Sequence, residues 1–65
     1  MPQVLTIKQH RLIKGKTQLD MAQALHVSKP TYARIEKDVE KATMGQIKAI
    51  CNILEISIEQ VFFAR

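Results

Sequence analysis

Residues 17–36, with the sequence TQLDMAQALHVSKPTYARIE, contain the signals that decide the fold. Thr17 is followed three residues later by Asp20, which approximates a capping box: a hydroxyl accepts a hydrogen bond from a free backbone N–H, and an acid lies in the positive first turn. Apolar residues then recur at helical spacing, at Leu19, Met21, Ala22 and Leu25. This pattern predicts a short helix from about residue 18 to about residue 25 that turns these side chains inward.

A second helix is predicted after Ser28, which belongs to the residue types that cap helix N-termini well. Pro30 is tolerated in a first turn, because its missing N–H would have no partner there. Tyr32 and Ile35, spaced three residues apart, are expected on the inner face. Only residues 26–27 separate the two predicted helices, so the helices must cross steeply, as in a helix-turn-helix motif.

Three further helices are predicted around this pair. Residues 7–14 have helical spacing and stop at Gly15, Thr43 caps a fourth helix, and Ser57 caps a fifth that ends near Phe63. The residues expected to face inward are Met44, Ile47, Ile50, Cys51 and Leu54 in the fourth helix and Ile58, Val61 and Phe62 in the fifth. With a polar connection over residues 37–42, the sequence predicts a compact all-α domain of five helices.

The length and composition of the chain exclude several classes of protein. Its 65 residues form at most one domain, residues 1–65, with no room for an enzyme scaffold and a substrate cleft. Cys51 is the single cysteine, so an intramolecular disulfide is impossible. Cys51, His10 and His26 match no metal-ligand spacing, so we expect no metal and no cofactor.

The sequence also predicts the compartment and the kind of partner. The N-terminal residues lack the basic stretch and the apolar run of a signal peptide, and no run approaches the roughly 18 residues of a membrane span. A lone thiol fits a reducing compartment, so we expect a cytoplasmic protein that does not contact membranes. The net charge of +4 and the pI of about 9.6 indicate a polyanionic partner.

Residues 17–36 resemble the Cro and repressor class of helix-turn-helix regulators, whose pattern is TQxxLAxxLGVSxxTISxIE. The match extends without a gap from Ile7 to Phe62. SIEQVF at residues 57–62 is similar to the family's closing SLDELF, and GKTQ at residues 15–18 is similar to its GxTQ. The resemblance implies the five-helix, lambda-repressor-like fold, with the helix-turn-helix at residues 17–36, and double-stranded DNA as the partner.

Several positions depart from the family pattern. His26 and Glu55 replace glycines that often adopt the left-handed region, so both are expected to be slightly strained. Lys37-Asp38 replaces Asn-Gly, Ala42 replaces a proline, and His10 falls on an apolar position. Leu12 and Ile13 fall where the family usually carries exposed polar residues, which leaves open a slight rotation of the first helix or an apolar surface patch.

The resemblance implies that the helix after Ser28 lies in the DNA major groove and presents its N-terminal half to base edges. Arg34 is the best candidate for reading guanine, because a guanidinium bonds bidentately to O6 and N7, and Pro30 and Ala33 offer apolar contact to a thymine methyl. The residues expected to contact bases are Lys29, Pro30, Thr31, Ala33 and Arg34.

Phosphate contacts are expected on the edge of the same surface. Gln18 matches the phosphate-contacting glutamine of the family, and the resemblance also implies a structural ion pair between Arg11 and Glu36. Residues 8–41 contain eight basic and four acidic residues, so the positive charge is concentrated in the helix-turn-helix half. The residues expected to contact phosphates are Lys16, Thr17, Gln18, Ser28, Lys37 and Lys41.

The C-terminal helix, residues 57–63, is the expected dimerisation end. Consecutive helical residues point in different directions, so Phe63 is expected to face outward when Phe62 faces inward. The residues expected at the dimer interface are Ile53, Ile56, Ile58 and Phe63. Two-fold dimers of this class place their recognition helices one DNA turn apart, which predicts a palindromic operator.

The sequence therefore predicts a bacterial or phage transcription regulator, found on the nucleoid when bound to DNA, which represses from a palindromic operator as a homodimer. Two alternatives also bind DNA: the controller of a restriction–modification operon and the antitoxin of a toxin–antitoxin pair. A third is a protein-interaction module that relies on Leu12, Ile13 and Phe63. No small-molecule effector is expected, whereas a partner protein such as a toxin or an antirepressor is compatible with the sequence.

Overall fold

The computed structural model describes the backbone of residues 5–63 and the side chains of residues 5–61. This part of the chain contains helices and no strands, which confirms the all-α prediction. The elements, in order, are α1 (Ile7–Ile13), α2 (Gln18–Ala24), α3 (Lys29–Lys37), the 3-10 turn η1 (Val39–Lys41), α4 (Met44–Leu54) and α5 (Ile58–Phe63). Each predicted helix is present within one residue of its expected bounds, and none of the described helices is long and apolar enough to cross a bilayer.

Side chains at the helix starts satisfy backbone groups that would otherwise lack partners. Thr17 accepts a hydrogen bond from the Asp20 N–H at 3.0 Å, and the Asp20 carboxylate accepts one from the Thr17 N–H at 2.8 Å. These hydrogen bonds hold the pKa of the Asp20 carboxyl below its usual range. Reciprocal pairs of the same kind link Thr6 with Gln9, Thr43 with Gln46 and Ser57 with Gln60.

Two turns use the left-handed backbone conformation, as expected from the replaced glycines. His26, between α2 and α3, has a φ of 59°, and Glu55, after α4, has a φ of 58°. Gly15 ends α1 with a φ of 70°. A side chain in this region is less favourable than glycine, so His26 and Glu55 each carry some backbone strain.

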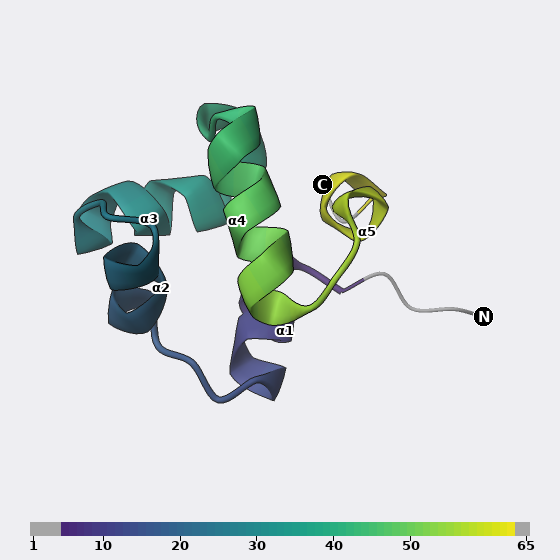
Figure 1. The fold of residues 1–65 in the computed structure, drawn as a ribbon, viewed down its shortest axis with the longest axis horizontal. Coiled ribbons are helices and arrows are strands. Elements are labelled where there is room, and N and C mark those ends of the chain that lie inside the picture. The colour runs from purple at the N-terminus through teal and green to yellow at the C-terminus, as the bar shows by residue number, and fades with distance from the viewer. Residues whose placement is uncertain (1–4, 64–65) are drawn as a thin grey trace.

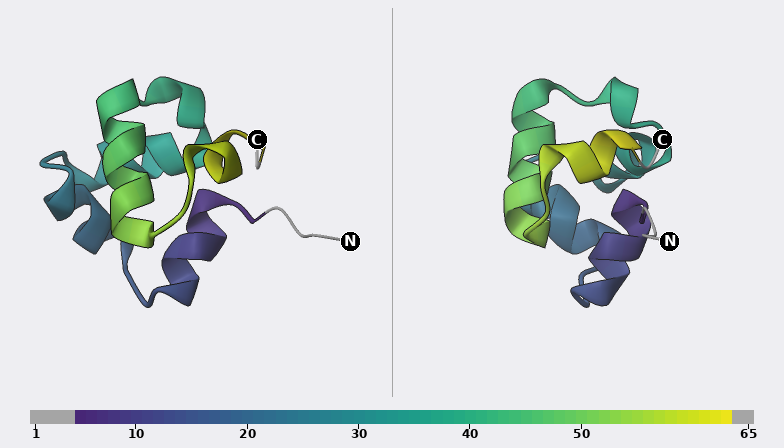
Figure 2. Two further views of the ribbon diagram at one scale, coloured as in Figure 1. Left: turned by 45° about the vertical axis from the view of Figure 1, so that its right-hand side comes forward. Right: turned by 90° about the vertical axis from the view of Figure 1, so that its right-hand side faces the viewer.

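The helices pack around α4. In Figure 1, α4 runs through the middle of the molecule, with α2 and α3 on one side and α5 on the other. Figure 2 shows from two further directions that α1 lies beside α5, and Ile7 of α1 and Val61 of α5 line the same pocket. The largest fully buried side chains, which form the centre of the core, are Met21, Tyr32, Ile35, Ile50 and Leu54. The expectation that Tyr32 belongs to the core is confirmed.

Three expectations about burial are wrong. Leu19 is 50% exposed, because it lies about 200° around α2 from the buried Met21. Met44 is 52% exposed, because it is the first residue of α4, at the end that projects beyond α3 and α5 in Figure 1. The connection over residues 37–42 is not wholly polar, since the turn η1, capped by Asp38, buries Val39 in the core.

Candidate nucleic-acid interface

The outer face of α3 carries the residues that were expected to contact DNA bases. Tyr32 and Ile35 define the buried stripe of this helix, so the outward stripe is centred on Pro30, Arg34 and Lys37, which are all exposed. Lys29 is exposed on the flank of the outward stripe. Thr31 and Ala33 are half-buried, so the most accessible charged groups on α3 belong to its three cations.

The start of α3 is held in place by its N-cap. Ser28 Oγ accepts a hydrogen bond from the Thr31 N–H at 3.3 Å and donates one to Thr31 Oγ1 at 2.8 Å. This leaves the hydroxyl proton of Thr31 free to donate to another acceptor. The first turn of α3 is therefore capped by Ser28, and Lys29 and Pro30 are exposed on it.

A groove of about 580 Å³ lies where α1, α2 and the start of α3 meet. It brings together Lys16, Thr17 and Gln18, from the start of α2, with Lys29 from α3. No acidic residue lines it. The nine residues that line this groove, called the α1–α2 groove below, are Lys8, Arg11, Leu12, Gly15, Lys16, Thr17, Gln18, Leu19 and Lys29.

Arg11 connects the wall of this groove to α3. Its guanidinium is buried, and its Nε and Nη2 donate to the Glu36 carboxylate at 3.1–3.3 Å. Its Nη1 donates to the backbone carbonyl of Lys16 at 2.8 Å. One side chain thus fixes α1, the turn before α2 and the last part of α3 relative to one another.

The Tyr32 hydroxyl lies beneath α3, close enough to Glu36 and Arg11 to be affected by both charges. It is fully buried and has no hydrogen-bond partner among the described residues. Burial, together with the negative charge of Glu36, raises the pKa of this hydroxyl well above its ordinary value. Because the side chain of Tyr32 is fully buried, its aromatic ring is not available for stacking on a base.

A helix-turn-helix family model matches residues 7–61, which is most of the chain. The chain belongs to the Cro/C1-type helix-turn-helix family. Domains of this family are DNA-binding regulatory domains and are typically not enzymes, so membership supports a DNA-binding role in transcription regulation. Searches among curated proteins and among solved structures gave no match. Among the described residues, no cluster of His, Cys, Asp and Glu has an arrangement that would hold a metal ion.

The predicted phosphate contacts of this helix-turn-helix protein do not all lie in one place. Lys16, Thr17 and Gln18 share the α1–α2 groove, whereas Lys37 lines a different pocket of about 400 Å³ between α1, α3, η1 and α5. Lys41 lies at the end of η1, beyond that pocket. The structure therefore does not gather the six predicted phosphate contacts on one edge.

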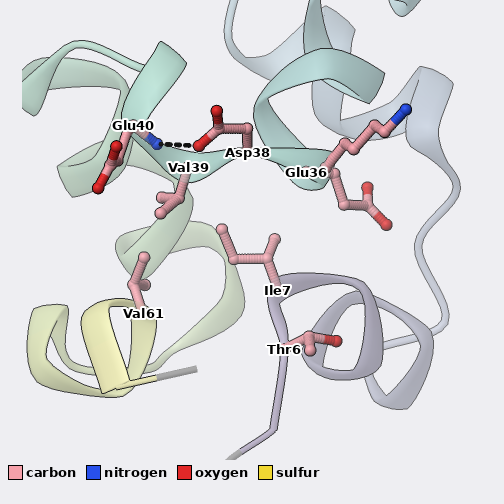
Figure 3. Close-up of a pocket in the computed structure, with 8 residues that line it drawn as sticks. Thr6, Ile7, Glu36, Asp38, Val39, Glu40 and Val61 are labelled. Carbon is pink, nitrogen blue, oxygen red and sulfur yellow. Dashed lines mark hydrogen bonds between the residues drawn. The ribbon is translucent and has the colours of Figure 1, made fainter. Parts of the chain in front are cut away.

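The second pocket differs from the groove in the sign of its charge. Ile7, Val39 and Val61 face one another across it, as Figure 3 shows. Three of its other lining residues are acidic, Glu36, Asp38 and Glu40, and the Asp38 carboxylate accepts a hydrogen bond from the Glu40 N–H at 3.1 Å. Such a pocket disfavours binding of a polyanion. The α1–α2 groove is therefore the more suitable place for a nucleic acid that also contacts the exposed face of α3.

The predicted dimer residues also contribute to the core. Ile53, Ile56 and Ile58 are half-buried and pack against the core cluster, which leaves only part of each side chain accessible. The side chain of Phe63 lies outside the described residues.

Lys8 is a residue of the α1–α2 groove that the sequence does not single out. It lines the α1–α2 groove together with Arg11, Leu12 and Gly15. The signal was present, because positions 8, 11, 12 and 15 have the i, i+3, i+4, i+7 spacing of one helix face.

Proposed function

We propose that this helix-turn-helix protein recognises a specific double-stranded DNA sequence, binds a palindromic operator as a homodimer and represses transcription by occluding the promoter. The single observation that carries this proposal is the outward stripe of α3, with Lys29 and Arg34 exposed, next to a groove that contains Lys16 and Gln18 and no acid. Major-groove insertion of a helix with flanking phosphate contacts requires such a surface.

Arg34 is the residue proposed to read a base directly. Its exposed guanidinium has the planar donor pair that matches O6 and N7 of guanine. Lys29, at the N-terminal end of α3, is proposed to contact a second guanine or a phosphate. Pro30, Thr31 and Ala33 present small surfaces that suit a thymine methyl or the close approach of the helix to base edges.

Phosphate contacts are proposed to fix the register of α3 in the groove. Lys16, Thr17 and Gln18 would hold one backbone segment. Further contacts would come from Ser28 before the start of α3, Lys37 at its last residue and Lys41 beyond its end. Arg11 and Glu36 support this arrangement from beneath, because they link α3 to the chain around Lys16.

The homodimer is proposed to form through the C-terminal end, with Ile53, Ile56, Ile58 and Phe63 at its interface. Two copies related by a two-fold axis would place their α3 helices about 34 Å apart, on half-sites separated by one DNA turn. The spacing between half-sites in DNA that the protein selects would therefore report the distance between the two α3 helices of the dimer.

Selection of bound duplexes from a random DNA pool tests this function. We expect an inverted repeat with guanine in each half-site and a centre-to-centre spacing of about 10 base pairs. A regulator that binds as a monomer would instead select a single half-site, and a chain that does not bind DNA specifically would select no sequence. Affinity for the selected duplex should fall steeply as salt rises, because phosphate contacts release counterions.

A further inference from the structure

Two exposed leucines lie in the α1–α2 groove, and contact with DNA does not account for them. Leu12 of α1 is 57% exposed and Leu19 of α2 is 50% exposed, and both line the groove. A phosphate backbone gains nothing from a leucine side chain, whereas covering one removes apolar surface from water and stabilises a complex. Exposed apolar side chains that share one concave surface mark an interaction site.

The charges around the two leucines are all of one sign. Lys8, Lys16 and Lys29 line the groove, and none of them forms an ion pair within residues 5–61. Arg11 is the fourth cation, but its charge is neutralised by Glu36. An occupant that is complementary to this surface carries carboxylates around apolar side chains.

We propose that the α1–α2 groove is a docking surface for an acidic peptide segment of a partner protein, which inserts leucine-sized side chains against Leu12 and Leu19 and places carboxylates beside Lys8, Lys16 and Lys29. A second copy of this chain is not the proposed occupant, because the proposed homodimer uses the C-terminal end and a second copy would bring a net charge of +4 to a groove that is already basic.

Docking of this segment excludes DNA. Lys16, Gln18 and Lys29 line the groove and also belong to the proposed DNA-contacting set, so one occupant covers the groups that the other needs. This step rests on the proposed function, whereas peptide binding itself does not. A partner with such a segment would release the regulator from its operator.

The test begins with a displayed library of random peptides, selected against the wild-type protein. Enriched peptides should combine Asp or Glu with Leu, Ile or Phe, and the consensus peptide is then synthesised with a fluorescent label. The double variant Leu12→Ser, Leu19→Ser should bind this peptide about tenfold more weakly or worse, since it removes two apolar contacts. Ile13→Ser is the matched control, because Ile13 is 69% exposed but does not line the groove.

The charge of the groove is tested through Lys8, which lies in the groove but not in the proposed DNA-contacting set. Lys8→Gln should weaken the consensus peptide several-fold. Lys48→Gln, an exposed lysine of α4 outside the groove, removes the same charge and should leave peptide binding unchanged.

Competition with the selected duplex distinguishes the two proposals. Unlabelled duplex should displace the labelled peptide, while the Leu12→Ser, Leu19→Ser variant keeps its affinity for DNA. The docking proposal is overturned if no acidic and apolar peptides are enriched, or if the double variant binds the peptide as the wild type does. It is also overturned if the double variant loses DNA affinity in equal measure, because the leucines then belong to the DNA interface. Failure of the DNA selection alone refutes the proposed function and leaves peptide binding standing.

Discussion

Arg11 and Glu36, separated by 25 residues in the chain, form a buried ion pair that joins α1 to the last part of α3 at 3.1 Å. Both side chains are almost completely covered, and Arg11 also donates to the Lys16 carbonyl. The pair therefore fixes the proposed recognition helix relative to the groove beside it.

Glu36→Gln should destabilise the fold strongly. The substitution leaves the buried guanidinium of Arg11 without a counter-charge, which typically costs about 3–5 kcal/mol. Urea denaturation measures this loss. Lys14→Gln is the matched control, because the Lys14–Glu55 pair has the same 3.1 Å separation but is exposed, so its loss should cost less than about 1 kcal/mol. Equal losses in the two variants would show that the buried pair contributes no more than a surface pair.

Stability should fall at alkaline pH because of Tyr32. The pKa of the Tyr32 hydroxyl in the folded protein is raised above the ordinary value of 10.0. The stability that the protonated hydroxyl contributes is therefore complete below pH 10 and is lost as pH rises above that value. While the folded hydroxyl stays protonated, the loss is about 1.4 kcal/mol per pH unit. The free energy of unfolding, measured by denaturant titration at successive pH values, reports this slope.

Tyr32→Phe isolates this effect from the titration of the lysines. The hydroxyl has no hydrogen-bond partner within the described residues, so its removal should change stability little at neutral pH. The variant should nevertheless lose stability less steeply than the wild type above pH 10. Identical alkaline slopes in the two proteins would refute the attribution to Tyr32.

His26→Gly should stabilise the protein. The left-handed φ of 59° costs a side chain more than it costs glycine, and the gain should be about 0.5–1 kcal/mol after the larger entropy of glycine in the unfolded chain is subtracted. Thermal denaturation measures whether the melting temperature rises or falls. Lys48→Gly, in the exposed interior of α4, controls for glycine itself and should destabilise by up to about 1 kcal/mol. A loss of stability in both variants would show that His26 is not strained.

The sequence predicts local structure in this domain better than it predicts the site. Thr17 and Asp20 identify the start of α2, because a cap acts within one helical turn. The left-handed conformation of His26 can be predicted because the helix-turn-helix pattern has a glycine at this position. The spacing of Leu19 predicts an inward side chain, but its position around α2 turns it to solvent. Whether an apolar residue on a short helix meets the core depends on how its neighbours pack.

The α1–α2 groove could not be predicted for the same reason. Lys8 and Lys29 lie far apart in the chain and line one groove only because α1, α2 and α3 meet there. Lys37 is a different case, because the acidic residues that share its pocket, Glu36, Asp38 and Glu40, are its close neighbours in the chain, so this local negative charge could have been predicted. Tertiary packing, which short-range patterns do not encode, forms the α1–α2 groove, whereas the acidic surroundings of Lys37 are already local in the sequence.

Arg34→Ala and Lys16→Gln should alter DNA binding in different ways. Loss of a bidentate guanine contact costs about 1–3 kcal/mol on the selected duplex but little on duplexes that lack that guanine, so Arg34→Ala should relax specificity at one position of each half-site. Lys16→Gln should weaken all duplexes alike and reduce the salt slope by about one per protomer.

Binding isotherms at several salt concentrations, on the selected duplex and on duplexes changed at each position, separate these effects. Lys48→Gln serves as the control for net charge, because Lys48 is exposed on α4 and outside the proposed interface. If Arg34→Ala weakens all duplexes equally, Arg34 contacts a phosphate. Lys29 is then the remaining candidate for a direct contact with a guanine. If Lys16→Gln leaves the salt slope at the wild-type value, the α1–α2 groove does not hold the DNA backbone, and its lysines remain available to an acidic protein partner alone.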